Sequence, residues 1–190
     1  MKILCAEYNA VREVAIVPVG DDVLLRNNED FYIPDFSPEV SCVPQLVVRL
    51  CKLGKTVSER FAGRYYEEIG VGIRFYADSF EEELERKGLP VGMASSFGGC
   101  AAISGLLPKQ ECCGAAYTML VNGQEVFRDS LAEQPAGIER LISLASDFHT
   151  LKIGDFLYCG NGFRYRGLKA GDRIEVVFEG RGKWMEFGIM

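Results

Sequence analysis

The side chains that most often carry out catalysis are few in this chain and are not spaced as a catalytic site. Its single histidine, His149, follows a predicted helix, where a surface or capping role is expected. The seven cysteines include no CxxC pair, so the sequence predicts no zinc site. Cys42, Cys100 and Cys159 could offer a nucleophile, but a nucleophilic thiol needs an adjacent base or a lowered pKa. We therefore expect reduced, structural cysteines.

Two further patterns could bind phosphate or nucleic acid, and neither is complete. The glycine-rich turns at 98–99 and 160–162 lack the Lys-Ser/Thr ending and the following helix of a phosphate loop. The cluster Arg164-Tyr165-Arg166 beside Lys169 joins basic residues to an aromatic one, but it is small and the chain has a net charge of −6. We expect a solvated hairpin at this cluster and no nucleic-acid partner.

Short apolar runs separated by turn residues predict a β-rich α+β fold. Residues 45–51 are apolar on both faces, which is typical of a strand covered from both sides. Residues 14–17 and 23–25 are expected to form a hairpin around Gly20-Asp21-Asp22. Asn122-Gly123 between two apolar runs is the strongest hairpin signal in the chain.

Three helices are expected between these strands. The first begins at Ser58 and carries Phe61, Tyr65 and Ile69 at four-residue spacing. The second covers 80–87, with Ser79 and Glu82 as its capping box. The third covers 136–148 and places four apolar residues on one face.

Length and composition predict a single domain over residues 1–190. A chain of 190 residues buries well over half of its unfolded surface without disulfides or a structural metal. The amino terminus lacks the apolar stretch of a secretory signal, and no segment approaches the roughly 18 apolar residues of a membrane span. We expect a cytoplasmic protein with no membrane partner.

Three stretches in a fixed order carry a resemblance to a known family. They are residues 31–87, the run from Gly88-Leu89-Pro90 to Pro108, and a third group formed by Asn122-Gly123, 151–155 and 167–175. Together they resemble the fumarylacetoacetate hydrolase family, which includes 2-hydroxyhepta-2,4-diene-1,7-dioate isomerases and acylpyruvases. The resemblance implies a β-roll with short flanking helices and a homodimer.

The resemblance also implies a metal-dependent reaction. Members of the family hold Mg²⁺ or Mn²⁺ with a Glu-x-Glu on one strand and an Asp on the neighbouring strand. Residues i and i+2 of a strand point to the same face, and carboxylate oxygens suit hard cations. The ion polarises a 2-oxo acid or 1,3-dicarbonyl so that cleavage, decarboxylation or isomerisation proceeds through an enolate.

The residues at the metal positions of this chain are not carboxylates. The Glu-x-Glu corresponds to Val43-Pro44-Gln45 and the Asp to Arg74. Valine donates no ligand, a neutral amide is a weak one, and arginine carries a fixed positive charge. Asp78 lies four positions after Arg74 and could supply at most one carboxylate. We therefore expect no metal cofactor.

The other working positions of the family differ as well. The family has a Trp, a Lys and an Asp after Gly-Leu-Pro, an Asn-Tyr followed by a basic His near the amino terminus, and a late Thr-Gly-Thr-Pro turn. The corresponding residues here are Val91, Ser95 and Gly98, then Glu7-Tyr8 and Val11, and finally Cys159-Gly160-Asn161-Gly162. The resemblance therefore assigns no catalytic residue.

Five residues around these positions form a candidate ligand cleft: Tyr8, Gln45, Arg74, Ser95 and Asn161. Arg74 could hold a small carboxylate by a bidentate pair. The competing interpretation is a local ion pair of Arg74 with Glu67, Glu68 or another local acid.

Two functions follow from the resemblance. The first is a non-catalytic homodimer that binds a small carboxylate through the old cleft or serves as a scaffold. The alternative is an active hydrolase, lyase or isomerase on small 2-oxo or 1,3-dicarbonyl acids with a rebuilt site. Trp184 could anchor the dimer interface or pack in the core.

Overall fold

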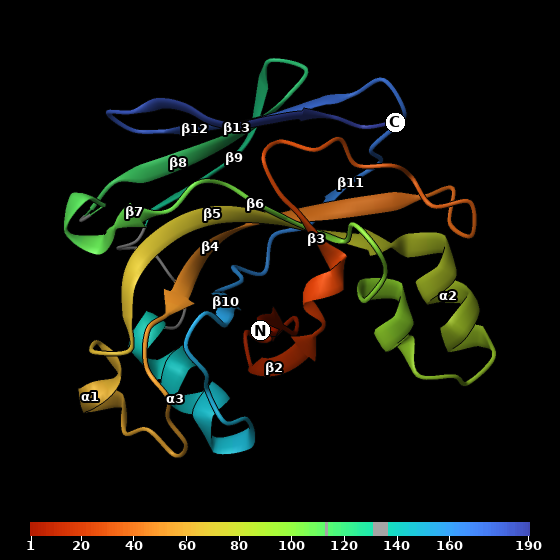
Figure 1. Cartoon of the computed structure of the whole chain (residues 1–190). Coiled ribbons are helices and arrows are strands. Elements are labelled where there is room, and N and C mark those ends of the chain that lie inside the picture. The colour runs from red at the N-terminus through yellow and green to blue at the C-terminus, as the bar shows by residue number, and fades with distance from the viewer. Residues whose placement is uncertain (113, 131–136) are drawn as a thin grey trace.

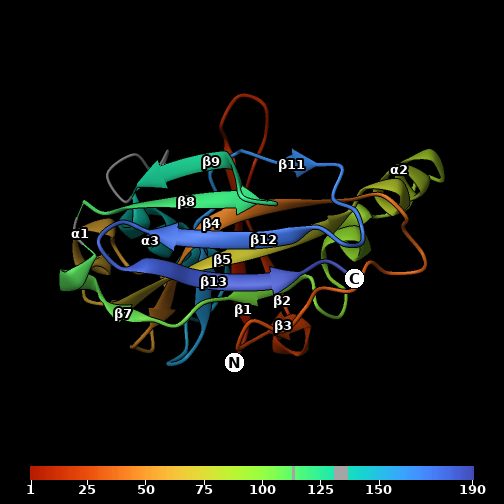
Figure 2. The ribbon, with the colours of Figure 1, turned by 90° about the horizontal axis from the view of Figure 1, so that it is seen from above.

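The computed structural model describes residues 1–112, 114–130 and 137–190. Strands dominate these residues and form two sheets, while short helices flank the ends of the larger sheet (Figure 1). The predicted β-rich α+β class is therefore confirmed. Seen from above, the smaller sheet lies across the two longest strands of the larger one (Figure 2).

Two long antiparallel strands form the centre of the larger sheet, β4 (Val40–Leu50) and β5 (Tyr66–Ala77). The described strands of this sheet run in the order β2-β1-β10-β4-β5-β6-β3, with β11 on β4 and β7 on β5. The flanking strands are β1 (Ile3–Tyr8), β2 (Val14–Val19), β3 (Leu24–Leu25), β6 (Ala101–Ile103), β7 (Leu107–Pro108), β10 (Phe156–Tyr158) and β11 (Tyr165–Arg166). As the sequence predicts, β4 is covered on both faces, and all but one of its residues are buried.

The smaller sheet consists of β8 (Ala116–Val121), β9 (Gln124–Ser130), β12 (Arg173–Phe178) and β13 (Gly182–Gly188), in the order β13-β12-β8-β9. The predicted hairpin at Asn122-Gly123 is confirmed, because it joins β8 to β9. Leu46 and Val48 of β4 share one buried apolar cluster with Met119 and Val176 of the smaller sheet. Burial between the two layers is the main source of stability of this fold.

Three helices and three 3₁₀ turns complete the described structure: α1 (Glu59–Ala62), α2 (Asp78–Arg86), α3 (Ile138–Phe148), η1 (Asp21–Val23), η2 (Val91–Ser95) and η3 (Lys109–Glu111). The expected apolar face of α3 is confirmed, since Ile138, Leu141, Ile142 and Ala145 are all buried. Its predicted first residue, Ala136, lies outside the described residues. His149 is the residue that follows α3 at its C-cap, as the sequence indicates.

The predicted helix from Ser58 to Ile69 is wrong beyond its first turn. Helix α1 ends at Ala62, and Ile69 lies in β5, paired with Val48 of β4. The four-residue spacing of the aromatic and aliphatic residues was therefore coincidental. A long ladder to a buried partner strand outweighs local helix preference.

Two smaller predictions are also wrong. Residues 14–17 and 23–25 do not form a hairpin: β2 pairs with β1, and β3 pairs in parallel with β6. Ser79 does not cap α2, because the hydroxyl of Ser79 accepts a hydrogen bond from the Glu39 backbone N–H at 3.0 Å. The helix instead begins directly where β5 ends, at Asp78. No helix among the described residues is long and apolar enough to cross a membrane.

Candidate functional site

The pairing of β4 with β5 brings the predicted metal positions together. Val43 stands opposite Arg74, and Gln45 stands opposite Gly72. Val43 and Gln45 are two residues apart, so their side chains leave β4 on the same face. The expected grouping of these three positions is thus reproduced by the register of the two central strands.

Arg74 is the largest fully buried side chain at this centre, with no exposed surface. The Arg74 Nη1 donates to Cys100 Sγ at 3.3 Å, and Nη2 donates to the Ser95 backbone carbonyl. The Nε atom of Arg74 has no hydrogen-bond partner in the described structure. A buried guanidinium keeps its charge, so Arg74 places a fixed positive charge on this face of the sheet.

The predicted local ion pair of Arg74 is wrong. No carboxylate of the described residues lies within ion-pair distance of Arg74, and Glu68 instead pairs with Arg49 at 3.1 Å. The reason is geometric: Glu68 lies six residues before Arg74 on β5, so its side chain projects on the same face but about 20 Å away. The charge of Arg74 is therefore balanced by an acid beyond ion-pair distance, Glu7.

Glu7 on β1 is the acid that faces this charge, a role that was not predicted from the sequence. Tyr76, two residues after Arg74 on β5, donates its hydroxyl to both carboxylate oxygens of Glu7 at 2.8 Å. Burial raises the pKa of Glu7, while the charge of Arg74 and the bond from Tyr76 oppose the rise. Two guanidinium groups also lie near the Tyr76 ring, with Arg74 Cζ at 5.7 Å and Arg164 Cζ at 4.4 Å from its centroid.

The remaining cleft residues gather around the turn at 159–162. Gln45 Oε1 accepts a hydrogen bond from the Gly160 N–H at 3.0 Å, and Asn161 Nδ2 donates to the Pro44 carbonyl. The Tyr8 hydroxyl donates to the Cys159 carbonyl at 3.4 Å. The structure therefore brings Tyr8, Gln45 and Asn161 together, while Arg74 and Ser95 form a second group beside them.

The 159–162 turn is pressed closely against β1. A Cβ at Gly160 would lie 2.3 Å from the Ala6 carbonyl oxygen and 2.8 Å from the Tyr8 ring. Gly160 also has a φ of 61°, a left-handed conformation that favours glycine. The turn that corresponds to the substrate turn of the family therefore packs directly against β1 of the same chain.

The cluster at 164–166 is not the predicted solvated hairpin. Strand β11 pairs with β4, and Arg164 forms ion pairs with Asp78 and with Glu81 at 2.6 Å. Asp78 is buried and also accepts a hydrogen bond from the Ser41 hydroxyl at 2.8 Å. The carboxylate nearest in sequence to Arg74 is therefore already held by protein partners.

The cysteines of this centre have the properties of structural residues. Burial raises the pKa of Cys159 to about 12, and it raises the pKa of Cys42 as well. Thiols whose pKa is raised hold little thiolate at neutral pH. These two side chains pack in the apolar core between the sheets.

Comparison with known proteins shows that the chain is similar in sequence to oxaloacetate tautomerases. The chain matches no protein-family model. It is 28% identical over 177 residues to the oxaloacetate tautomerase YcgM of Escherichia coli, covering 90% of this chain and 81% of that protein. It is 26% identical over 181 residues to the mitochondrial oxaloacetate tautomerase FAHD1 of Mus musculus, covering 90% and 82%.

Solved structures share the fold over the whole chain. A putative fumarylacetoacetate hydrolase family protein from Yersinia pestis has a TM-score of 0.87 and 24% identity, covering 100% of this chain and 92% of its own. A fumarylpyruvate hydrolase from Pseudomonas aeruginosa, in complex with Mn²⁺ and pyruvate, has a TM-score of 0.87 and 17% identity, covering 100% and 89%. The chain is therefore similar in sequence to oxaloacetate tautomerases and similar in fold to members of the fumarylacetoacetate hydrolase family.

The residues present do not fit the divalent ion of the fumarylacetoacetate hydrolase family. Val43 has no donor atom, the oxygen of Gln45 is bonded to Gly160, and Arg74 adds a positive charge. The nearby acids Glu7 and Asp78 are bonded to a tyrosine and to arginines. Within the described ranges, no three His, Cys, Asp or Glu residues are grouped to hold a metal.

Side chains also pack over the central strands of the larger sheet. Tyr158 lies over Gly72, where a Cβ would come within 2.4 Å of the tyrosine ring, and its hydroxyl donates to the Ala102 carbonyl at 3.0 Å. Val43 and Gln45 are both buried. The larger cavities lined by described residues lie elsewhere, between the β6–β7 connection and β13 and beside α1.

Proposed function

We propose that this chain is a member of the fumarylacetoacetate hydrolase family that has lost the metal-dependent chemistry and serves as a non-catalytic, homodimeric scaffold. The relatives in sequence are enzymes by name, and one structural neighbour holds Mn²⁺ and pyruvate. Under this proposal the chain keeps the fold of these enzymes but not their metal-dependent activity. The homodimer and the cytoplasmic location are predictions that accompany it.

The observation that carries the proposal is the buried guanidinium of Arg74. It takes the position of a metal-binding carboxylate and is held by Ser95 and Cys100. A cation at this place repels a second cation, and the neighbouring Val43 and Gln45 offer no charge to compensate. Metal chemistry would require at least these three residues to change together.

A second candidate function is the binding of a small carboxylate at the same centre. It is favoured by one observation, the unpartnered Nε of Arg74, which is a donor that a carboxylate oxygen could accept from. Against it stands the packing of Tyr158 and the 159–162 turn over the strands, which would have to move. We therefore rank carboxylate binding below a scaffold role.

The alternative of an active enzyme with a rebuilt site is supported by Glu7 and Tyr76. A carboxyl group with a raised pKa, bonded to a tyrosine and facing two arginines, has the composition of an acid–base pair. Its substrates would be small 2-oxo or 1,3-dicarbonyl acids. The same bonds equally neutralise a buried arginine, which is the role we assign to them.

The proposal is tested by an assay of oxaloacetate tautomerisation, in which the reaction is monitored through the decrease in enol absorbance. We expect the purified protein to give the blank rate with Mg²⁺, with Mn²⁺ and after chelation, while the E. coli relative assayed in parallel accelerates the reaction. Metal-dependent turnover by the wild-type chain would overturn the proposal. Metal-independent turnover that is lost in Glu7→Gln would favour the rebuilt site.

Carboxylate binding is tested separately by thermal unfolding with pyruvate, oxalate and acetate. A scaffold is expected to show no shift with any of them. A saturable rise in Tm that disappears in Arg74→Met would instead support the carboxylate site. The molar mass from sedimentation equilibrium tests whether the chain forms the predicted homodimer.

A further inference from the structure

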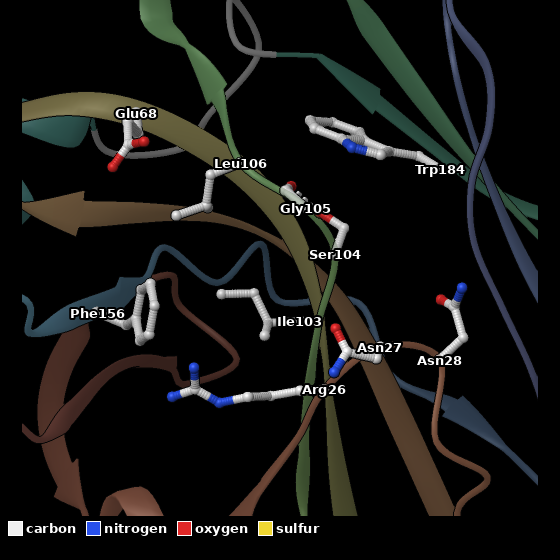
Figure 3. Close-up of a pocket in the computed structure, with 10 residues that line it drawn as sticks. All are labelled: Arg26, Asn27, Asn28, Glu68, Ile103, Ser104, Gly105, Leu106, Phe156 and Trp184. Carbon is white, nitrogen blue, oxygen red and sulfur yellow. Dashed lines mark hydrogen bonds between the residues drawn. The ribbon is translucent and has the colours of Figure 1, made fainter.

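A cavity of about 510 Å³ lies between the β6–β7 connection, the turn after β3 and Trp184 of β13 (Figure 3). Pockets of roughly 300–1,000 Å³ are the size that holds small molecules. Ile103 in its wall pairs with Gly72 of β5, two residues before Arg74, and Glu68 at its edge lies six residues before Arg74, a separation of about 20 Å. None of the five predicted cleft residues lines this cavity.

One part of the cavity wall is apolar and includes two flat rings, while the remainder is lined by polar residues. Ile103, Leu106 and Phe156 lie along one side, and the indole of Trp184 lies across from them (Figure 3). Trp184 packs against Phe178 with ring centroids 4.4 Å apart, so one edge of the indole is fixed in the smaller sheet. Walls of this kind favour a planar, apolar ligand.

A tight turn presents polar groups to the same space. The Glu29 N–H donates to the Arg26 carbonyl at 3.1 Å, and the two residues between them have φ values of 55° and 60°. Asparagine tolerates this left-handed conformation better than most residues, and both are asparagines. Asn28 Oδ1 accepts a hydrogen bond from the Glu186 N–H at 3.2 Å, which attaches the turn to β13 near Trp184.

Several donors in the cavity are unused by the part of the chain that the structure describes. Neither the Arg26 guanidinium nor the Asn27 amide makes a hydrogen bond or ion pair with a described residue, and both lie over the cavity in Figure 3. The indole N–H of Trp184 likewise has no described acceptor. The acid at the edge, Glu68, is already paired with Arg49. Arg26 therefore brings to the cavity a positive charge that no described carboxylate pairs with.

We propose that this cavity is a binding site for a small aromatic carboxylate. Arg26 and the Asn27 amide bind the carboxylate, and the ligand ring lies between the aliphatic wall and the indole of Trp184. Gly105 leaves the indole edge open, since even an added Cβ would be 3.8 Å from Trp184 Nε1. The proposal does not depend on whether the central site is catalytic.

The position of the single tryptophan supplies a direct assay. Trp184 is the only tryptophan of the chain, so emission excited at wavelengths where tyrosine does not absorb reports on this cavity alone. Phenylacetate is the probe, and phenylacetamide, acetate and inorganic phosphate are the comparison compounds. We expect a saturable change of emission with phenylacetate in the millimolar range or below and a weaker response to the other three.

Two variants locate the site. Arg26→Gln is expected to weaken phenylacetate binding about tenfold and to leave phenylacetamide binding unchanged, because only the carboxylate needs the guanidinium. Arg60→Gln removes an exposed arginine of α1, outside the cavity, and is expected to change neither. Binding to Trp184→Phe, which lacks the reporter, is followed by calorimetry and is expected to be weaker than wild type.

Three results would overturn the proposal. The first is an emission spectrum that phenylacetate does not change in a saturable way. The second is an equal effect of Arg26→Gln and Arg60→Gln, which would place the anion elsewhere or indicate screening alone. The third is binding of acetate or phosphate that is as tight as that of phenylacetate or tighter, which would show that the aromatic ring of the ligand adds nothing to binding. Circular dichroism of each variant confirms that the fold is retained.

Discussion

The account of the central site makes a definite prediction for Arg74→Met. Methionine keeps most of the buried volume but removes the charge, so the cavity contribution is small. The change leaves the Ser95 carbonyl without its donor and removes the cation that faces Glu7. Breaking one side of a buried charged group costs about 3–5 kcal/mol, and because Glu7 keeps its bond to Tyr76 we expect about 3 kcal/mol.

The loss of unfolding free energy in Arg74→Met depends on pH, because the titration of Glu7 changes with the substitution. Burial already raises the pKa of Glu7, and Arg74 is the strongest influence that opposes the rise. Without Arg74 the folded-state pKa of Glu7 rises further, so ionising Glu7 above the ordinary glutamate pKa of 4.5 favours the unfolded chain more strongly. The destabilisation by Arg74→Met is therefore smallest near pH 4.5 and grows as the pH rises through the folded pKa.

Urea unfolding followed by circular dichroism at pH 5 and pH 7.5 measures both effects. In a chain of this size about 3 kcal/mol corresponds to a fall in Tm of about 6–12 °C. In the Glu7→Gln background the cost of Arg74→Met is expected to fall by about 1 kcal/mol or more, because the two side chains interact. A cost that is the same at both pH values and the same in both backgrounds would refute the proposed coupling.

Three further predictions concern the scaffold. Gly160→Ala is expected to cost at least about 2 kcal/mol more than Gly167→Ala, because both have positive φ but only Gly160 lies against a neighbouring carbonyl; equal urea midpoints would contradict this. Asp155→Asn is expected to cost about 2 kcal/mol relative to the exposed control Asp35→Asn, since buried Asp155 accepts the backbone N–H groups of Lys2 and Lys152 at 2.9 Å. Tyr76→Phe leaves Glu7 without its donor and is expected to cost about 1–2 kcal/mol at pH 7.5 and less near pH 4.5; a cost that rises on acidification would count against that assignment.

Local signals predicted those parts of the fold that local chemistry controls. The Asn122-Gly123 turn needs positive φ at its centre, and both residues adopt it. The apolar face of α3 has the helical period and packs as expected. The helix after Ser58 failed because the partner of residues 66–69 is a strand more than 15 positions earlier in the chain, which the local pattern does not contain.

The centre was predicted in position but not in its bonds. Resemblance placed Val43, Gln45 and Arg74 together, and the register of β4 and β5 agrees. The partners of Arg74 could not be predicted, since Ser95 and Cys100 reach it from a 3₁₀ turn and a loop. Glu7 was missed as the facing acid because β1 joins the sheet through β10, a strand from the far end of the sequence.

The most direct measurement of the central claim is Mn²⁺ binding, followed by the paramagnetic resonance signal of the free ion. The account predicts that the wild-type protein leaves this signal unchanged at equimolar and excess metal, since Arg74 and its neighbours offer no ligand set. Stoichiometric loss of the free Mn²⁺ signal, abolished by Gln45→Ala but not by the distant Glu125→Gln, would contradict it.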